Sequence, residues 1–250
     1  MNPGDPRGAL RARARAGLEQ LARNPYPGRG LVLGRAQADD AWLQVYWIMG
    51  RSSNSRNRIF VAEGTSLRTE PFDASRLEDP RLVIYEAMLE VDGVHIVSNG
   101  DQTRTVAEAL RAGGSFEGAL ATREREPDAP HYTPRISGIL DLRERAPRLA
   151  LSLLRASPAD AAETDRFTFR PALPPPGLGL GLTTYAGDGD PLPPFAGEPL
   201  WLPLPGEADE VLETYWQALD PDNRVALAVK RIPDRGEARL GVRSRHDARP

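Results

Sequence analysis

Residues Tyr46–Phe60 read YWIMGRSSNSRNRIF, an apolar run that changes abruptly into small polar residues carrying three arginines. The apolar half is typical of a buried strand. The polar half is too rich in Ser and Asn for a helix, and its charges predict an exposed tail. Arg51, Arg56 and Arg58 carry planar guanidinium groups that suit bidentate binding of phosphate or amide oxygens. The segment is therefore either an anion site or a solvated loop.

The bulk composition favours a globular protein with a small-molecule partner. With 250 residues and 40% apolar content, the chain can form one large domain or two small ones around a substantial core. The net charge of −3 and the pI near 5.8 argue against a nucleic-acid or anionic-membrane surface, since either needs a basic excess. Only Lys230 among the 32 basic residues is a lysine, which indicates a coding bias toward arginine. Because of this bias, a single arginine is weak evidence for a functional site.

Several kinds of site are excluded by the residues themselves. Without cysteine, the chain has no disulfide, thiolate nucleophile or cysteine metal site. Of the three histidines, His95, His131 and His246, none has a partner at metal-ligand spacing, so we expect no metal. The run Gly177–Leu182, GLGLGL, lacks the spacing of a phosphate loop, and no G-x-S-x-G elbow occurs.

The hydropathy pattern points to a cytoplasmic protein. No stretch approaches the roughly 20 apolar residues of a membrane span, and the N-terminus lacks the apolar segment of a secretory signal. Residues 1–25 are expected to be a helical extension, in which the helix Arg7–Arg23 ends at Asn24-Pro25. Its stripe of Leu10, Ala14, Leu18 and Leu21 has few large side chains, so we expect it to dock on its own domain rather than on a membrane.

From Gly28 onward the pattern changes to short strands separated by turns. Strands are expected over 30–35, 42–49, 58–63, 67–72, 82–91, 94–97, 132–142, 148–154, 166–170, 180–185, 224–232 and 238–243. Asp92-Gly93 fits a two-residue hairpin turn, because both central residues need positive φ. Asp101 is expected to cap a helix, with further helices over 116–123 and 207–219.

This order of strands and helices predicts an α+β fold with two sheets face to face and helices outside. We expect residues 26–250 to form a single domain. Residues 171–206 hold 10 of the 24 prolines but also Leu, Phe and Trp, so they are expected to form an ordered, irregular wall. Whether this wall closes over a substrate or only packs is left open.

Three further segments are candidates for a site. Ser98–Asp101 is interpreted as a tight turn before a helix, whose N-terminus would present free N–H groups to an anion. Pro134 fixes an extended backbone where Arg135 enters an apolar strand, so Arg135 is expected to point into a polar environment. Tyr85 lies on a strand next to Glu86, and alternation puts the two on opposite faces, so Tyr85 either packs in the core or faces a site.

Taken together and in this order, these segments resemble the archaeal-type IMP cyclohydrolase family. The matching pieces are Tyr26–Arg35, Tyr46–Arg56, the strand of Tyr85, Val97–Gly100 and Thr133–Ile136, with a weaker match at Leu182–Tyr185. The helix before Tyr26 is extra. SSNSRNR replaces a shorter arginine loop, which leaves open whether Arg56 or Arg58 occupies the family's site position, with Arg56 favoured.

The resemblance implies a four-layer αββα sandwich like that of N-terminal-nucleophile hydrolases, without their autoprocessed nucleophile. It also implies closure of 5-formamidoimidazole-4-carboxamide ribotide to inosine 5′-monophosphate with loss of water, a hydrolase-class reaction at a C–N bond other than a peptide bond. No metal or organic cofactor is required. By the same resemblance, Arg51, Arg56 and Tyr85 are expected to be catalytic, and the substrate is expected to contact Arg58, Asn99, Gly100 and Arg135.

Two alternatives to this enzyme stay open. The chain could bind or sense purine ribotides without turnover, or it could act on a related amide of a nucleotide. A scaffold role would leave the arginine loop and Arg135 unexplained. A β-rich domain with an added helix can also pair, so a homo-oligomer is left open.

Overall fold

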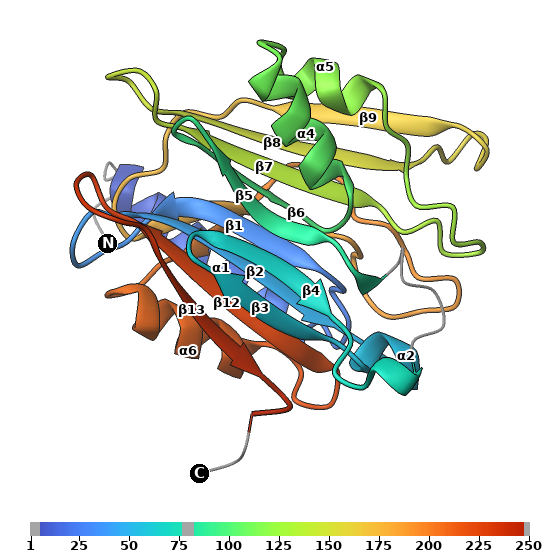
Figure 1. The fold of residues 1–250 in the computed structure, drawn as a ribbon. Helices are drawn as coiled ribbons and strands as arrows, with labels where there is room; N and C mark the ends of the chain where they lie inside the picture. The colour runs from blue at the N-terminus through green and yellow to red at the C-terminus, as the bar shows by residue number, and fades with distance from the viewer. Residues whose placement is uncertain (1–5, 77–82, 248–250) are drawn as a thin grey trace.

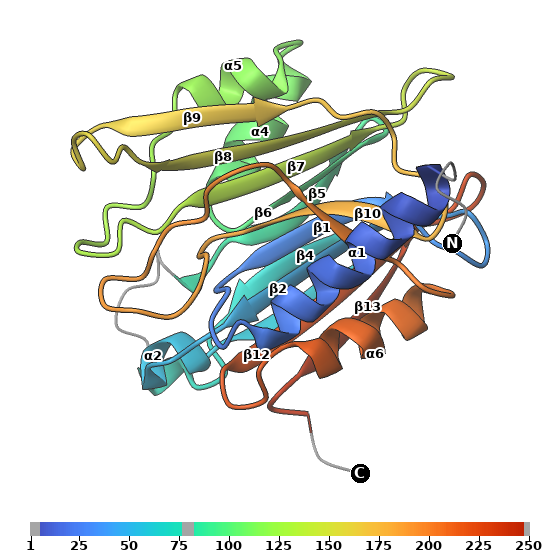
Figure 2. The same cartoon turned by 180° about the vertical axis from the view of Figure 1, so that it is seen from behind.

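The computed structural model describes residues 6–76 and 83–247, which form two antiparallel sheets with helices on their outer faces (Figures 1 and 2). The six-stranded sheet has the order β11-β10-β1-β2-β12-β13 and the seven-stranded sheet the order β3-β4-β5-β6-β7-β8-β9. The mixed α and β content and the two facing sheets confirm the sequence prediction at that level.

The helices and strands have the following bounds. The six-stranded sheet contains β1 Gly30–Arg35, β2 Trp42–Met49, β10 Leu178–Thr183, β11 Leu200–Pro203, β12 Arg224–Ile232 and β13 Arg239–Ser244. The other sheet contains β3 Ile59–Glu63, β4 Ser66–Glu70, β5 Glu86–Val91, β6 Val94–Ser98, β7 Arg135–Asp141, β8 Arg148–Ala156 and β9 Thr164–Phe169. The helices are α1 Pro6–Arg23, α2 Ser53–Arg56, the 3₁₀ turn η1 Ala74–Arg76, α4 Gln102–Arg111, α5 Phe116–Ala121 and α6 Ala208–Ala218.

Three hydrophobic clusters hold these elements together. The first lies between the sheets, where Leu31 and Leu33 of β1 meet Leu151 and Leu153 of β8. The second packs Trp47 and its neighbours on the six-stranded sheet against α1 and α6, and the third packs the seven-stranded sheet against α4 and α5. Alternation along each strand sends successive side chains into different clusters, which is why almost every residue of the central strands is buried.

The N-terminal helix docks on its own chain, as its stripe predicts. Ala14 and Leu21 are buried on α1, and Leu18 packs against the cluster of the six-stranded sheet. Leu180 and Leu182 of the GLGLGL run point into the core between the sheets, and the run forms strand β10. Its glycines lie close to Val32, Leu202 and Leu204 on the face that α1 covers. None of the helices in the two described ranges is long and apolar enough to cross a membrane.

Most expected strands are present, and the Asp92-Gly93 hairpin is confirmed by φ values of 47° and 79°. The start of the expected strand 82–91 falls at Leu82, outside the described residues, and regular pairing begins at Glu86. Tyr85 still pairs through its backbone, since its carbonyl accepts from the Thr69 amide at 2.9 Å. The segment 171–206 is more regular than expected, because it contains β10 and the edge strand β11, where Pro203 is tolerated.

Two local predictions are wrong. The segment after Gly50 contains the one-turn helix α2, because the Ser52 side chain accepts a hydrogen bond from the Ser55 amide and the Ser55 side chain accepts one from the Ser52 amide. The serines that disfavour a helix interior cap this short helix instead. Its tail is not exposed either, since Asn57 and Arg58 are both buried.

The other wrong prediction concerns the start of α4. Asp101 makes no side-chain cap. Its carboxylate pairs instead with Arg123 and with Arg135, whose Nη1 lies 2.7 Å from Oδ1. Two fixed cations therefore outcompete the helix N–H groups for this carboxylate.

We predict that Gly30→Ala destabilises the fold by roughly 1–3 kcal/mol, because a Cβ at this position would overlap the Trp47 ring. Urea denaturation measures the effect. Gly187→Ala is the matched control, since its Cβ would meet nothing within 4 Å. Equal stabilities of the two variants would contradict the close packing of β1 on β2.

Candidate active site

A cavity of about 310 Å³ opens at the end of the two sheets near α2. Its walls come from the turn before β1, the end of β2, the α2 segment, the loop before β7 and the chain after β10. These segments are far apart in sequence, but antiparallel pairing of β1 with β2 and β10 brings three of them to one edge. Gly28, with φ of 71°, turns the chain into β1 at a point where a side chain would overlap Thr184.

A buried ion pair forms the floor of the site. Arg29 Nη1 donates to Glu126 Oε1 at 2.8 Å, and the two side chains are only 11% and 7% exposed. Burial opposes the charge of Arg29, but Glu126 and the neighbouring tyrosines raise the pKa of this guanidinium well above its usual value. Arg29 is therefore a permanent cation in a low-dielectric environment.

Arg58 adds a second buried cation, one that forms no ion pair with a carboxylate of the described residues. It lines the cavity and is 6% exposed, and its Nε has no hydrogen-bond partner within the described parts of the chain. Burial and the charge of Arg29 lower the pKa of Arg58. Because a buried charge is costly unless it is paired, this end of the protein is prepared for an anionic or strongly polarised ligand group.

Two tyrosine hydroxyls meet next to the arginines. Tyr46 Oη and Tyr85 Oη are 2.7 Å apart in a buried hydrogen bond. Burial and the neighbouring Tyr85 raise the pKa of Tyr46 well above its usual value, with Arg29 and Arg58 opposing the shift. Tyr46 therefore stays protonated and can serve as a hydrogen-bond donor.

An aromatic wall lines another side of the cavity. The Tyr26 and Tyr185 rings are stacked with centroids 5.9 Å apart, and the Arg51 guanidinium lies over the Tyr26 ring at 4.9 Å. Tyr185 Oη is 2.6 Å from Thr133 Oγ1, which fixes its ring. Flat aromatic faces next to cations suit a planar, heteroaromatic ligand.

The Pro-rich segment closes one side of the mouth. Arg51 forms an ion pair with Asp188 and donates to the Gly189 carbonyl at 3.1 Å. On the other side, the Leu192 amide donates to His131 Nδ1 at 3.2 Å. Three polar contacts thus hold residues 188–192 against the α2 segment and the loop before β7.

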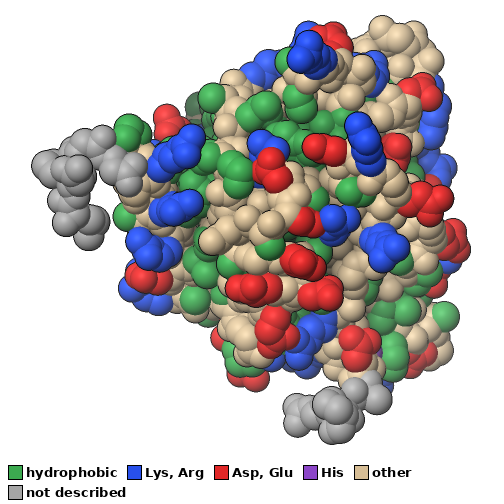
Figure 3. All heavy atoms as spheres, turned by 90° about the vertical axis from the view of Figure 1, so that its left-hand side faces the viewer, with side chains coloured by type: hydrophobic (Ala, Val, Ile, Leu, Met, Phe, Trp, Pro, Cys, Tyr) green, Lys and Arg blue, Asp and Glu red, His purple; other side chains and the backbone are tan. Residues whose placement is uncertain are grey.

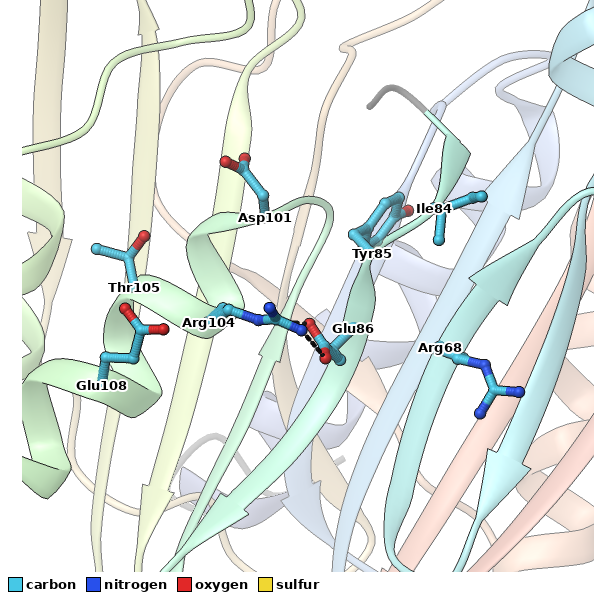
Figure 4. A pocket seen from close by; sticks show the side chains of 8 residues that line it. All are labelled: Arg68, Ile84, Tyr85, Glu86, Asp101, Arg104, Thr105 and Glu108. Atoms are coloured by element: carbon cyan, nitrogen blue, oxygen red, sulfur yellow. Dashed lines mark hydrogen bonds and ion pairs between the residues drawn. The ribbon is translucent and has the colours of Figure 1, made fainter. Parts of the chain in front are cut away.

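A second cavity of about 520 Å³ lies beside the first, between β4, the start of β5 and α4 (Figure 4). Tyr85 lines it, although the Tyr85 hydroxyl meets Tyr46 next to the arginines. Arg104 of α4 pairs with Glu86, and Asp101 lies at the start of the same helix. Every arginine on this second cavity is ion-paired, so it has less capacity for an anion than the first.

The structure brings together three of the residues expected from the sequence. Arg51 and Arg58 line the first cavity. Tyr85 lies close enough to Arg58 to raise the pKa of its guanidinium electrostatically, against the effect of burial. Arg56 lies elsewhere: its Nε donates to the Gly50 carbonyl at 2.9 Å and its Nη2 to Asn223 Oδ1 at 3.3 Å. These contacts hold the α2 segment to β12, and the catalytic role expected for Arg56 remains a prediction.

Asn99, Gly100 and Arg135 form a separate polar network. Asn99 is fully buried, and its side-chain amide contacts the Pro134 carbonyl, the Ile136 amide and Gln102. The Gly100 carbonyl accepts from Thr103 Oγ1 at 2.9 Å. Arg135 points into a polar environment as expected, since it donates to the Glu124 carbonyl and to Asp101. Their expected contacts with substrate also remain predictions.

Three residues at the centre of this site, Arg29, Tyr46 and Glu126, were not singled out from the sequence. Arg29 lies between two glycines just before an apolar strand, which was a usable signal. Glu126 is 97 positions away and has no local signature. No group of His, Asp and Glu that could hold a metal occurs among residues 6–76 and 83–247.

Comparison with known proteins agrees with this geometry. A family model described as IMP cyclohydrolase-like protein matches residues 26–236, which is more than half of the chain. A curated relative from Methanopyrus kandleri, named IMP cyclohydrolase, is 34% identical over 119 residues. That alignment covers 46% of this chain and 59% of the relative, so the chain spans less than two thirds of the relative's length.

We predict that Glu126→Gln destabilises the protein by roughly 3–5 kcal/mol, because it leaves the buried charge of Arg29 uncompensated. Chemical denaturation at low and high phosphate measures the loss, and phosphate is expected to restore part of it by occupying the cationic cavity. Glu198→Gln is the control, since its ion pair with Arg13 is 3.7 Å long and exposed. A loss at Glu126 no larger than at Glu198 would contradict the buried pair.

Proposed function

The chain belongs to the IMP cyclohydrolase-like family, and from this premise we propose that it closes 5-formamidoimidazole-4-carboxamide ribotide to inosine 5′-monophosphate with loss of water. This reaction would place it in purine biosynthesis. The observation that carries the proposal is the pair of buried guanidiniums, Arg29 and Arg58, in a cavity large enough for a ribotide base. Arg29 is paired with Glu126, whereas Arg58 has no ion pair among residues 6–76 and 83–247.

The ring closure sets three physical requirements. The carboxamide nitrogen must be held close to the formyl carbon, the oxygen that gains negative charge needs fixed donors, and a proton must reach the departing hydroxyl. Because the reaction is a dehydration without change of oxidation state, it calls for no redox cofactor.

Arg58 is proposed to bind the oxygen on which charge develops. Arg58 lines the cavity and its side chain is held in place by burial, so a ligand oxygen would meet a guanidinium donor that needs no reorganisation. Arg29 is held by Glu126 and contributes a fixed positive field next to it. Arg51 is more exposed at the mouth, where it is proposed to bind the ribotide phosphate in competition with Asp188.

The base is proposed to lie against the stacked Tyr26 and Tyr185 rings. This placement directs the reacting groups toward Arg58 and the Tyr46–Tyr85 hydroxyl pair. The two hydrogens that leave with the formyl oxygen as water come from the carboxamide and formamide nitrogens. One hydroxyl of the pair donates a proton to the departing hydroxyl group while the other takes up the proton released by the ring-closing nitrogen, and their hydrogen bond returns both tyrosines to the protonated state. The family resemblance implies that Tyr85 is catalytic, and we propose that Tyr46 acts with it as its hydrogen-bond partner.

The order of layers supports the fold that the resemblance implies. α1 and α6 lie outside the six-stranded sheet, and α4 and α5 lie outside the seven-stranded sheet. We infer that this is the four-layer αββα sandwich of the N-terminal-nucleophile hydrolase type.

We predict that Arg58→Gln lowers kcat for inosine monophosphate formation by roughly 100-fold or more, because it removes a fixed donor from the developing oxyanion. Tyr85→Phe is expected to lower kcat with a smaller change in KM, since the hydroxyl acts on the departing group rather than on binding. Product formation is followed by mass spectrometry from purified protein and the formylated ribotide.

Arg148→Gln is the matched control, because Arg148 is an exposed arginine of β8 paired with Glu144. It is expected to keep wild-type turnover. Wild-type turnover in both Arg58→Gln and Tyr85→Phe would refute the site assignment. Ribotide binding that depends on Arg58 with no product from the wild-type protein would refute the enzyme and leave a ribotide sensor.

A further inference from the structure

A third cavity, of about 780 Å³, lies at the end of the sheets opposite α2. Three hairpin turns surround it, the turns that join β3 to β4, β5 to β6 and β12 to β13. Figure 3 faces this end, where Asp and Glu side chains gather near the centre with arginines around them. Glu90, Asp92 and Glu237 contribute carboxylates to the cavity, and Leu142, Ile232 and Ala238 give it an apolar wall.

Lys230 lies directly behind this wall. It is on β12 opposite Gln44 of β2, and its side chain is 0% exposed. Ala228, two positions earlier, packs between the sheets, whereas Val229 packs toward α6. Alternation therefore turns Lys230 and Gln44 into the space between the sheets.

The amine of Lys230 has no hydrogen bond within the described residues. Its Nζ is 3.9 Å from Glu90 Oε2, too far for one, and His95 Nδ1 is 3.4 Å from the same oxygen. Neither polar atom of the Gln44 amide has a partner within the described ranges. We call these four residues, Gln44, Glu90, His95 and Lys230, the distal cluster. Buried polar groups without hydrogen bonds lower the stability of the fold, which argues that these residues have a role beyond packing.

A second observation is that the buried basic residue at position 230 is a lysine and not an arginine. Every other basic residue apart from the histidines is an arginine, and an arginine stays charged in any protein environment. A lysine differs in that it can release its proton when buried. Burial lowers the pKa of Lys230 to about 8, with Glu90 opposing the shift, so a useful fraction of the amine is neutral near pH 7.5.

Glu90 connects this amine to the cavity, since Glu90 Oε2 lies 3.9 Å from Lys230 Nζ. Glu90 lines the cavity, is 35% exposed, and can change rotamer without disturbing the sheet. His95 also lines the cavity, and burial, followed by the charge of Lys230, lowers the pKa of its imidazole to about 3. The imidazole is therefore neutral at physiological pH, so it can only relay a proton, taking one at one ring nitrogen while releasing one at the other.

We propose that Lys230 is a reactive amine that forms an imine with small, uncharged aldehydes admitted through this cavity. The neutral amine attacks the carbonyl carbon and a C–N bond forms. Both amine hydrogens leave with the carbonyl oxygen as one molecule of water, with His95 carrying the proton between nitrogen and oxygen. The apolar wall favours an uncharged aldehyde, and the carboxylates at the mouth disfavour an anionic one.

The test exploits the fact that Lys230 is the only lysine. Folded full-length protein is treated with propanal and cyanoborohydride between pH 6 and 10, and the adducts are located by peptide mass mapping. We expect an adduct at Lys230 in addition to the α-amino group, with a rate that rises to a plateau around pH 8. Lys230→Arg is expected to lose that adduct only.

Glu90→Ala is expected to speed the modification of Lys230 several-fold, because it opens the wall and removes the charge that holds the proton. Glyoxylate, an anionic aldehyde, is expected to react several-fold more slowly than propanal. The same reaction in urea shows that both amines can be modified, whether or not the variants fold. Modification of the α-amino group alone in the folded wild-type protein, with both amines modified in urea, would overturn the proposal.

Discussion

The burial of Arg29 and Arg58 with a single carboxylate, Glu126, is the constraint that shapes the rest of the site. Two guanidiniums so close together repel each other, and both lose hydration, so the fold must supply stabilisation elsewhere. The hydrophobic cluster between the sheets supplies it, with aliphatic side chains from both sheets. Arg58, which has no ion pair among the described residues, is the cation that we propose to bind the anionic or polarised group of a ligand.

The two sheets also explain why polar groups collect at both ends of the space between them. β2 carries Gln44 and Tyr46 on the same face, and these side chains belong to opposite ends of the interface. At one end, arginines and tyrosines line a cavity that suits a ribotide. At the other end, a histidine and a glutamate line a cavity whose mouth is acidic, and a buried lysine lies beside them. Opposite mouth charges suggest that the two cavities take different classes of small molecule.

Local patterns in the sequence predicted the strands well, because alternation and turn residues are read over a few positions. β1, β2 and the Asp92-Gly93 hairpin are the clearest cases. α2 could not be predicted from composition, since its serines act as caps and only their geometry reveals it. The burial of Arg58 and its separation from Arg56 depend on how the segment folds over β2, and the partnership of Arg29 with Glu126 spans 97 positions. Such pairings are set by topology, and no local pattern records them.

A crystal structure with bound inosine 5′-monophosphate would test the central claim most directly. The account predicts the base against the Tyr26 ring, a base oxygen within hydrogen-bond distance of Arg58, and the phosphate at Arg51 with the Asp188 contact released. The nucleotide bound in either of the other two cavities, or in this one with Arg58 untouched, would contradict it.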